Sequence, residues 1–320
     1  MAKIKRRVIQ IANSTQLISL PRKWSVKYGV KKGDELEIEE QGNKLLIGTD
    51  KGVDLEKVEI DVTGLDRSSI MYYVRSVYRM GYDEIKVNFS NPTTIHYRLN
   101  EKKSIISVIH AEVNRLVGVE IVQQKENFCI IKDLSPNPPL TEFDNILRRI
   151  FLLTTDALKD FVEGMVGNNI LLVKTFEEKH DTITKFVSYC LRLLNKRGYP
   201  QPRKTSYLYH IIASLDRLVD VFKYSARYFI KYKPKLSKET INITVQIEKS
   251  IKIYSEFFYK FDLSKVVALY KNREDVLNSI EKLSLRSKLT TEKELLLLND
   301  MEHALEILVD LTEARMGLEY

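Results

Sequence analysis

Apolar residues alternate with other residues near the start of the chain, at residues 8–11 and 17–19. This period of two is typical of short β-strands. Pro21 can occupy the first position of a helix, so we expect a short helix over residues 22–28. A hairpin is expected over residues 36–47. The pattern therefore predicts a small β-rich module at residues 1–50.

A mixed pattern of strands and helices follows, over residues 56–134. We expect strands at 58–62, 84–89, 119–123 and 128–131, and helices at 66–78 and 104–117. The order β-α-β-α-β-β predicts a small α+β domain over residues 51–135. Tyr82, His96 and His110 stand without a glycine-rich loop or an acid/base set, so we interpret this domain as a linking domain.

Apolar residues recur at helical spacing after the proline-rich stretch Ser135-Pro-Asn-Pro-Pro139. Three prolines in four residues are incompatible with a helix, which marks a domain boundary. Beyond it we expect six helices, at about 141–167, 170–196, 205–231, 237–260, 263–288 and 290–317. Their short connections predict two antiparallel three-helix bundles in tandem over residues 136–320. The fold class is thus multi-domain, with an all-α C-terminal part.

Positive charge is concentrated at the N-terminus. Residues 1–32 contain nine Lys or Arg residues and no Asp or Glu, in a chain of 51 basic and 43 acidic residues. Without these nine, the chain has 42 basic and 43 acidic residues. A basic module beside a nearly neutral remainder is typical of nucleic-acid binding.

The same residues resemble a known family. The segments Ile9-Gln-Ile-Ala-Asn-Ser-Thr-Gln-Leu-Ile-Ser-Leu-Pro-Arg-Lys-Trp24 and Gly29-Val-Lys-Lys-Gly-Asp-Glu-Leu-Glu-Ile38 are similar to the AbrB/SpoVT (MazE-like) swapped-hairpin DNA-binding family. The resemblance implies an interlocked homodimer on double-stranded DNA. The candidate DNA-binding residues are Lys3, Lys5, Arg6, Arg7, Arg22 and Lys23. A solvated basic tail, or a protein-binding antitoxin-like hairpin, is the alternative interpretation.

Paired carboxylates occur on two of the expected helices. Glu177 and Asp181 are separated by four residues, as are Asp216 and Asp220, so each pair lies on one helical face. Carboxylate oxygens suit hard cations such as Mg²⁺ and Mn²⁺, and also iron. A solvated acidic face is the alternative. A weaker second set is Asp275, Glu302 and Glu306, in which Lys271 occupies the fourth place.

These acidic motifs resemble those of the phosphate-uptake regulator PhoU. The segments concerned are Phe176-Glu-Glu-Lys-His-Asp-Thr-Ile183, Ile212-Ala-Ser-Leu-Asp-Arg-Leu-Val-Asp220 and, less closely, Met301-Glu-His-Ala-Leu-Glu306. The resemblance implies a divalent metal or iron (Fe, Mn, Mg or Zn) on the first bundle, and a phosphate transporter component or signalling protein as partner. With the N-terminal module, the chain resembles an archaeal type that fuses an AbrB-like domain to a PhoU-like one.

Other classes of protein are disfavoured by the sequence. Cys129 and Cys190 are too few for a disulfide framework, and no 18 consecutive apolar residues occur, so we expect a cytoplasmic protein without membrane insertion. Glu177-x-x-His180 is similar to one half of a ferritin-like di-iron site, but Asp300-x-x-His303 is only an approximate second half. We therefore expect no enzyme. The expected function is a DNA-binding regulator of phosphate uptake. The alternative is a protein-interaction scaffold that restrains a phosphate transporter or kinase, with the N-terminus serving only for dimerisation.

Overall fold

The computed structural model describes residues 4–11, 15–49, 55–134, 141–285 and 292–320. It divides into two compact units, Met1–Glu56 and Lys57–Tyr320. The expected junction at 50–54 and the proline-rich boundary at 135–139 both lie outside the described residues. The residues expected to form a separate middle domain belong to the same compact unit as the C-terminal helices.

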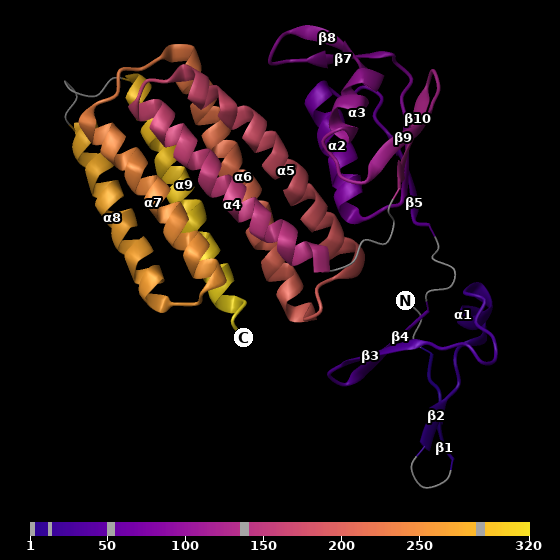
Figure 1. Cartoon of the computed structure of the whole chain (residues 1–320). Helices are drawn as coiled ribbons and strands as arrows, with labels where there is room; N and C mark the ends of the chain where they lie inside the picture. Colours follow the sequence, from indigo (N-terminus) through magenta and orange to yellow (C-terminus); the bar gives the residue numbers. More distant parts are fainter. Residues whose placement is uncertain (1–3, 12–14, 50–54, 135–140, 286–291) are drawn as a thin grey trace. The chain divides into compact units, whose positions relative to one another are not determined.

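The N-terminal unit contains two separate antiparallel hairpins and a short helix (Figure 1). Its elements are β1 (Val8–Ile11), β2 (Thr15–Ile18), α1 (Arg22–Lys27), β3 (Glu37–Gln41) and β4 (Lys44–Gly48). Pro21 immediately precedes α1 in an extended conformation, and Gly29 follows it with a φ of 63°. These elements agree with those expected from the alternating pattern and from the position of the proline.

This unit has no buried residue among those described. Its apolar side chains are instead exposed on the strands and on α1; the large ones are Val8, Ile9, Ile11, Leu17, Ile18, Val26, Ile38, Leu45 and Leu46. Two-stranded hairpins are marginally stable in water unless an apolar face is covered. A single copy of the N-terminal unit therefore lacks the core that would stabilise it.

The second unit begins with an α+β layer. Its elements are β5 (Lys57–Asp61), α2 (Arg67–Met80), β6 (Glu84–Asn88), β7 (Thr93–His96), β8 (Glu101–Ser104), α3 (Ile105–Val113), β9 (Val119–Gln124) and β10 (Phe128–Asp133). The strand order is β5-β6-β10-β9, in which β5 and β6 are parallel and the other pairs antiparallel. The short hairpin β7–β8 occupies a segment expected to be a loop.

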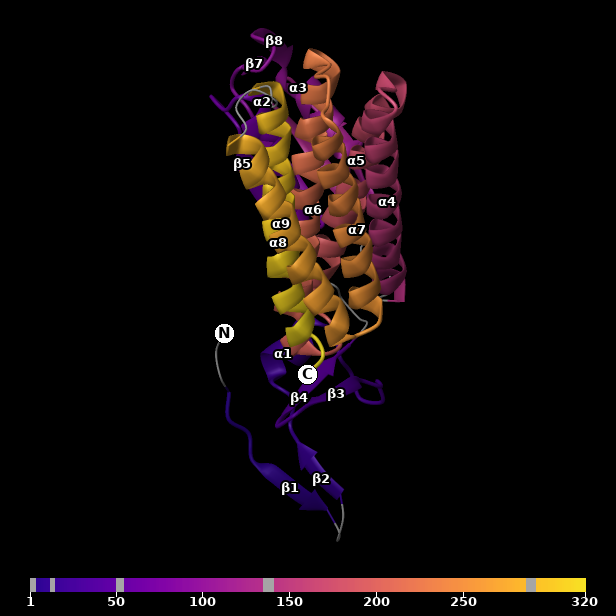
Figure 2. The same ribbon diagram turned by 90° about the vertical axis from the view of Figure 1, so that its left-hand side faces the viewer.

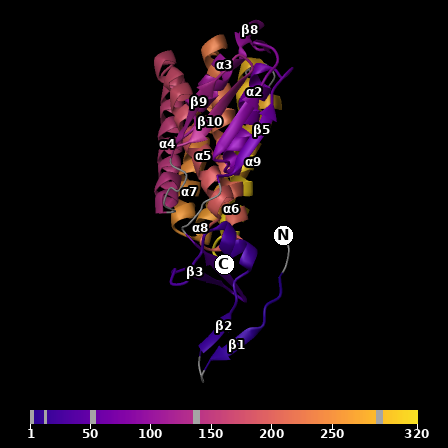
Figure 3. The same cartoon turned by 90° about the vertical axis from the view of Figure 1, so that its right-hand side faces the viewer.

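The helices α2 and α3 lie on one face of this sheet (Figures 1 and 3). Alternate residues of the strands, including Ile85, Val87 and Ile131, are buried with the apolar faces of both helices. The opposite face of the sheet is polar: Glu59 accepts hydrogen bonds from Lys86 and Asn88 there. The layer therefore has one core, on the side of its helices.

Six helices form the rest of the described chain, with roughly parallel long axes (Figure 2). They are α4 (Thr141–Val166), α5 (Ile170–Arg197), α6 (Pro202–Tyr232), α7 (Lys238–Tyr259), α8 (Leu263–Leu285) and α9 (Glu292–Gly317). Helices α4, α5 and α6 pack together, as do α7, α8 and α9, and the two sets meet through α6 with α9 and α4 with α7. Their buried side chains form one continuous core. No helix in the described ranges has the length and apolarity needed to cross a membrane.

The α+β layer packs on this bundle through α2 and α5. Arg192, on α5, is buried and donates hydrogen bonds to the Tyr78 carbonyl at 2.7 Å, the Tyr82 carbonyl at 2.8 Å and the Asp133 carboxylate at 2.6 Å. A buried guanidinium requires such acceptors, because an unpaired charge away from water is costly. Gly81 ends α2 with a φ of 107°, and a Cβ atom there would lie 3.0 Å from the Cβ of Lys196. The absence of a side chain thus lets α2 end close against α5.

Candidate functional site

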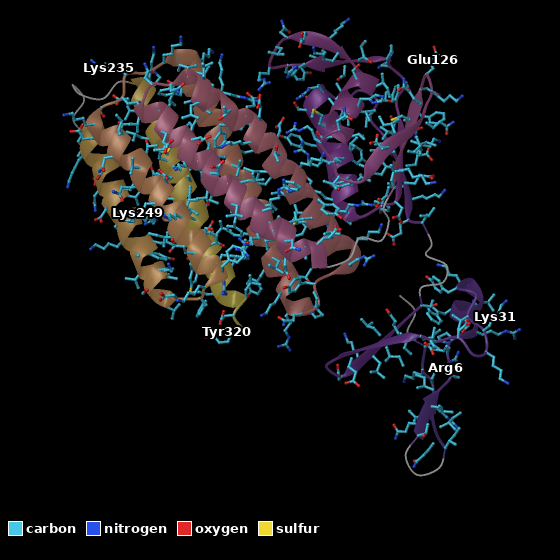
Figure 4. The ribbon with its side chains drawn as sticks, viewed as in Figure 1. Arg6, Lys31, Glu126, Lys235, Lys249 and Tyr320 are labelled. Carbon is cyan, nitrogen blue, oxygen red and sulfur yellow. The ribbon has the colours of Figure 1, made fainter. Side chains whose placement is uncertain are left out.

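The predicted DNA-binding residues are on the surface of the N-terminal unit. Lys5, Arg6, Arg7, Arg22 and Lys23 are all exposed, whereas Lys3 lies outside the described residues. Figure 4 labels Arg6 and Lys31, both in this unit. These five side chains are thus accessible to a large anionic partner. DNA binding itself stays a prediction.

The four predicted metal ligands lie on the neighbouring helices α5 and α6. Each of these carboxylates forms an ion pair with a basic side chain. Within the bundle, Glu177 pairs with Arg227 and Asp220 with Lys223. The other two pairs reach the α+β layer: Asp181 pairs with Arg115, and Asp216 with Arg79 at 2.9 Å.

His180 joins two of these carboxylates. Its ring is buried, with Nδ1 3.0 Å from an Asp181 oxygen and Nε2 2.8 Å from an Asp220 oxygen. The Lys223 ammonium lies 3.2 Å from the same Nε2 atom. The imidazole thus lies between two acidic side chains, one on α5 and one on α6. This polar network joins the two helices in addition to their apolar contacts.

The network lowers the pKa values of its carboxylates. Burial alone would raise the pKa of Asp220, but hydrogen bonds from His180 and Lys223 outweigh it and lower the value to about 2. For Asp181, burial is likewise outweighed by the His180 hydrogen bond and the Arg115 charge, and its pKa is lowered. The hydrogen bond from Arg227 lowers the pKa of Glu177. All three groups are therefore held in their charged form.

The arrangement does not fit a metal centre as it stands. No cluster of three or more His, Cys, Asp or Glu side chains suited to a metal ion occurs among the residues that the structure describes. The carboxylate oxygens that would coordinate a cation are already bonded to guanidinium or ammonium groups. A metal ion would have to displace these cations. The metal site stays a prediction.

The weaker second set is also joined to a basic residue. Glu306 pairs with Arg273, whose Nε lies 2.7 Å from a Glu306 oxygen. Arg273 also donates a hydrogen bond to Glu274, its neighbour in the chain. Asp275 lines a separate crevice of the bundle together with Lys271. Glu302 is half-buried on α9.

The basic partners of the acidic motifs are only partly indicated by the sequence. Lys223 and Arg227 follow Asp220 by three and seven residues, so helical periodicity already placed them on the same face of α6. Arg79 and Arg115 belong to the α+β layer and are distant along the chain. No local pattern indicated that they would meet Asp216 and Asp181.

Comparisons with known proteins give a weak likeness. No protein-family model matches the chain, and no curated protein matches it. Among solved structures, it is similar to the crystal structure of the phosphate transport system regulatory protein PhoU from Streptococcus pneumoniae, with 13% sequence identity and a TM-score of 0.48. The match covers 56% of this chain and 94% of that chain. A likeness at this level identifies neither a family nor an activity.

Proposed function

We propose that the chain is a DNA-binding regulator of phosphate uptake, whose N-terminal unit acts on double-stranded DNA as a homodimer. The best support for this proposal comes from three features of the N-terminal unit taken together. The described part of this unit buries no residue, exposes apolar strands, and carries exposed basic side chains. The link to phosphate uptake rests on the acidic motifs of α5 and α6 that resemble PhoU.

A second copy of the chain is the partner that best fits the exposed strands. Ile9 and Leu17 face each other in the β1–β2 register and are 56% and 43% exposed. Covering apolar surface stabilises an assembly by about 25 cal/mol per Å². A second N-terminal unit offers the same apolar strands, so two units can cover each other. Interlocked hairpins of this kind would also bring two sets of basic residues together.

The positive charge of the dimer is suited to DNA phosphates. A dimer offers two copies of Arg6, Arg7 and Arg22, all exposed in the single chain. Binding by phosphate contacts releases counterions and is therefore strongly salt-dependent. The larger unit would then act as the sensing or partner-binding part. A ligand or partner that binds one arrangement of the dimer more tightly than another would shift the dimer toward that arrangement. The affinity of the dimer for DNA would change as a result.

The test measures binding of the full chain to duplex DNA by fluorescence anisotropy at several salt concentrations. With about 6–10 phosphate contacts, affinity should fall by about 10³–10⁵-fold between 50 and 200 mM salt. The triple variant Arg6→Ala, Arg7→Ala, Arg22→Ala should lose binding. A control that removes three exposed basic residues of the larger unit, Arg148→Ala, Arg203→Ala, Lys249→Ala, should retain it. Salt-independent affinity, or equal losses in both variants, would refute the proposal.

The second candidate is a scaffold that restrains a phosphate transporter or kinase and uses its N-terminus only to dimerise. It is favoured by an apolar stripe on α8, where Leu263, Val267 and Tyr270 are exposed at helical spacing. Such a stripe is suited to packing against a protein partner. A chain that dimerises but does not bind duplex DNA at 50 mM salt would select this function over the first.

A further inference from the structure

A crevice lies between the α+β layer and the helical bundle of the second unit. It has a volume of about 290 Å³. From the layer it is lined by α2, by the β7–β8 hairpin and by the segment after α3; from the bundle it is lined by α5 and α6. The acidic network described above forms one wall, because Glu177, His180, Asp181 and Asp220 all line the crevice.

The crevice is rich in positive charge. Six basic side chains and three carboxylates line it; the basic ones are Arg67, Arg75, Arg98, Arg115, Lys223 and Arg227. Three of them neutralise the three carboxylates, and Arg75 pairs with the buried Glu112 at 2.6 Å. Arg67 and Arg98 form no ion pair with any other described residue. They leave an excess of positive charge in a partly enclosed space.

Two further observations indicate that an acceptor is missing from this space. The Nε atom of Arg115 is buried and has no hydrogen-bond partner among the described residues. Such donors are rare in folded proteins, because a buried N–H group without an acceptor has lost its hydrogen bonds to water and gained none in exchange. Burial, followed by the positive charges of Arg98 and Arg115, lowers the pKa of Arg67. The guanidinium groups therefore repel one another.

We propose that this crevice binds a small phosphorylated anion carrying at least two negative charges. A phosphoryl group has several acceptor oxygens in a geometry that matches guanidinium groups, which explains the use of Arg at five of the six basic positions. The volume is near the lower limit for small-molecule sites, so the ligand is of the size of a diphosphate or a mononucleotide. Duplex DNA is too large for it. The inference is independent of the proposed DNA binding, which concerns the N-terminal unit.

The position of the crevice gives the ligand a regulatory consequence. Its walls come from both the layer and the bundle, and the Arg115–Asp181 ion pair joins them. A phosphoryl group that accepts from the buried Nε of Arg115 shares this guanidinium with Asp181, and its negative charge weakens the attraction between Arg115 and Asp181. Occupancy of the crevice would therefore change the strength with which the layer is held on the bundle.

The experiment is isothermal titration of the full chain with sodium pyrophosphate and with ADP, each at constant ionic strength. We expect both to bind, and the double variant Arg67→Ala, Arg98→Ala to weaken binding by about tenfold or more, as the loss of charge-assisted hydrogen bonds implies. The control Arg148→Ala, Arg203→Ala removes two exposed arginines outside the crevice and should bind as the unmodified chain does.

The two ligands distinguish the sources of the phosphoryl group. Equal affinities would show that the phosphoryl groups alone are recognised, and tighter binding of ADP would show recognition of an organic phosphate. If the double variant does not fold, Arg98→Glu, at an exposed position, supplies the same test by reversing one charge. Absence of binding at 5 mM for both ligands, or equal weakening in the control variant, would overturn the proposal.

Discussion

Arg79 on α2 and Asp216 on α6 form an ion pair across the contact between the α+β layer and the bundle, with 2.9 Å between Nη2 and Oδ2. Their side chains are 20% and 15% exposed. Arg79 also donates to the Ser188 hydroxyl, and the Thr184 hydroxyl donates to Asp216 at 3.0 Å. An acidic residue that the sequence suggested as a metal ligand thus helps to hold the layer in place.

The first prediction concerns the strength of this pair. Arg79→Met and Asp216→Asn should each lower the free energy of unfolding by about 1–3 kcal/mol, because each leaves a partly buried charge without its partner. The double variant should lose less than the sum of the two losses. Urea unfolding measures the free energy of unfolding of the two single variants and the double variant. The exposed Lys159–Glu163 pair is the control, and breaking it should cost less than about 1 kcal/mol. Additive losses at Arg79 and Asp216 would contradict the coupling.

The second prediction is a dependence of stability on acid. The pKa of Asp220 is about 2 in the folded protein and about 3.9 in an unfolded chain. The stabilisation by this carboxylate is therefore complete above pH 4 and is lost as the pH falls from about 4 to about 2. Asp220→Asn should be less stable at pH 6 and should lose less stability over this acid range. Asp310→Asn, at an exposed position, is the control and should follow the unmodified chain. Thermal unfolding at each pH gives the comparison.

The third prediction separates backbone strain from close packing at Gly81. Gly81→Ala places a side chain at a φ of 107° and within 3.0 Å of Lys196 on α5. Gly118→Ala also introduces a residue at positive φ, but its Cβ would meet only an Asp133 oxygen at 3.7 Å. Both should be destabilising by about 1–3 kcal/mol, with Gly81→Ala the larger loss. Equal losses would show that the contact with α5 has no effect.

The fourth prediction addresses the metal site. Lys223→Met with Arg227→Met removes the cations bonded to Asp220 and Glu177. The freed carboxylates repel each other and Asp181, and a divalent ion would relieve this. We expect 1 mM Mn²⁺ to raise the melting temperature of this variant by several degrees more than that of the unmodified chain. The control Arg148→Met with Lys249→Met should respond as the unmodified chain does. An equal response in all three proteins would exclude competition between metal and side-chain cations.

The fifth prediction concerns the dimer. Ile9→Lys with Leu17→Lys places two charges on the exposed β1–β2 hairpin, where the two side chains face each other. The change should leave the larger unit folded and should shift the chain from dimer to monomer, measured by light scattering after gel filtration. Glu37→Lys with Glu40→Lys, at two exposed positions of β3, adds positive charge without removing apolar surface and is the control. A monomeric unmodified chain would refute the dimer outright.

Much of the secondary structure was determined by the sequence alone, because it depends on local patterns. The period-two pattern of β1 and Pro21 before α1 place both elements where they were expected. The six long helices follow from apolar residues at helical spacing. The hairpin β7–β8 was missed, since the sequence of β8, Glu101-Lys-Lys-Ser104, is polar and shows no alternation of apolar and polar residues.

The candidate sites depended on tertiary structure to a much greater degree. Spacing of four residues placed Asp181 beside Glu177 on one face of α5, and Asp220 beside Asp216 on α6. This spacing did not reveal which side chains pair with Asp181 and Asp216. Their partners, Arg115 and Arg79, belong to the α+β layer and reach the bundle only because the layer packs on it. Which charges form ion pairs depends on their distance in space. A desolvated carboxylate therefore pairs with the cationic side chain that the packing of the fold places next to it. The sequence therefore determined which residues carry charge, and the fold decided which of those charges neutralise one another and which, at Arg67 and Arg98, remain available to a ligand.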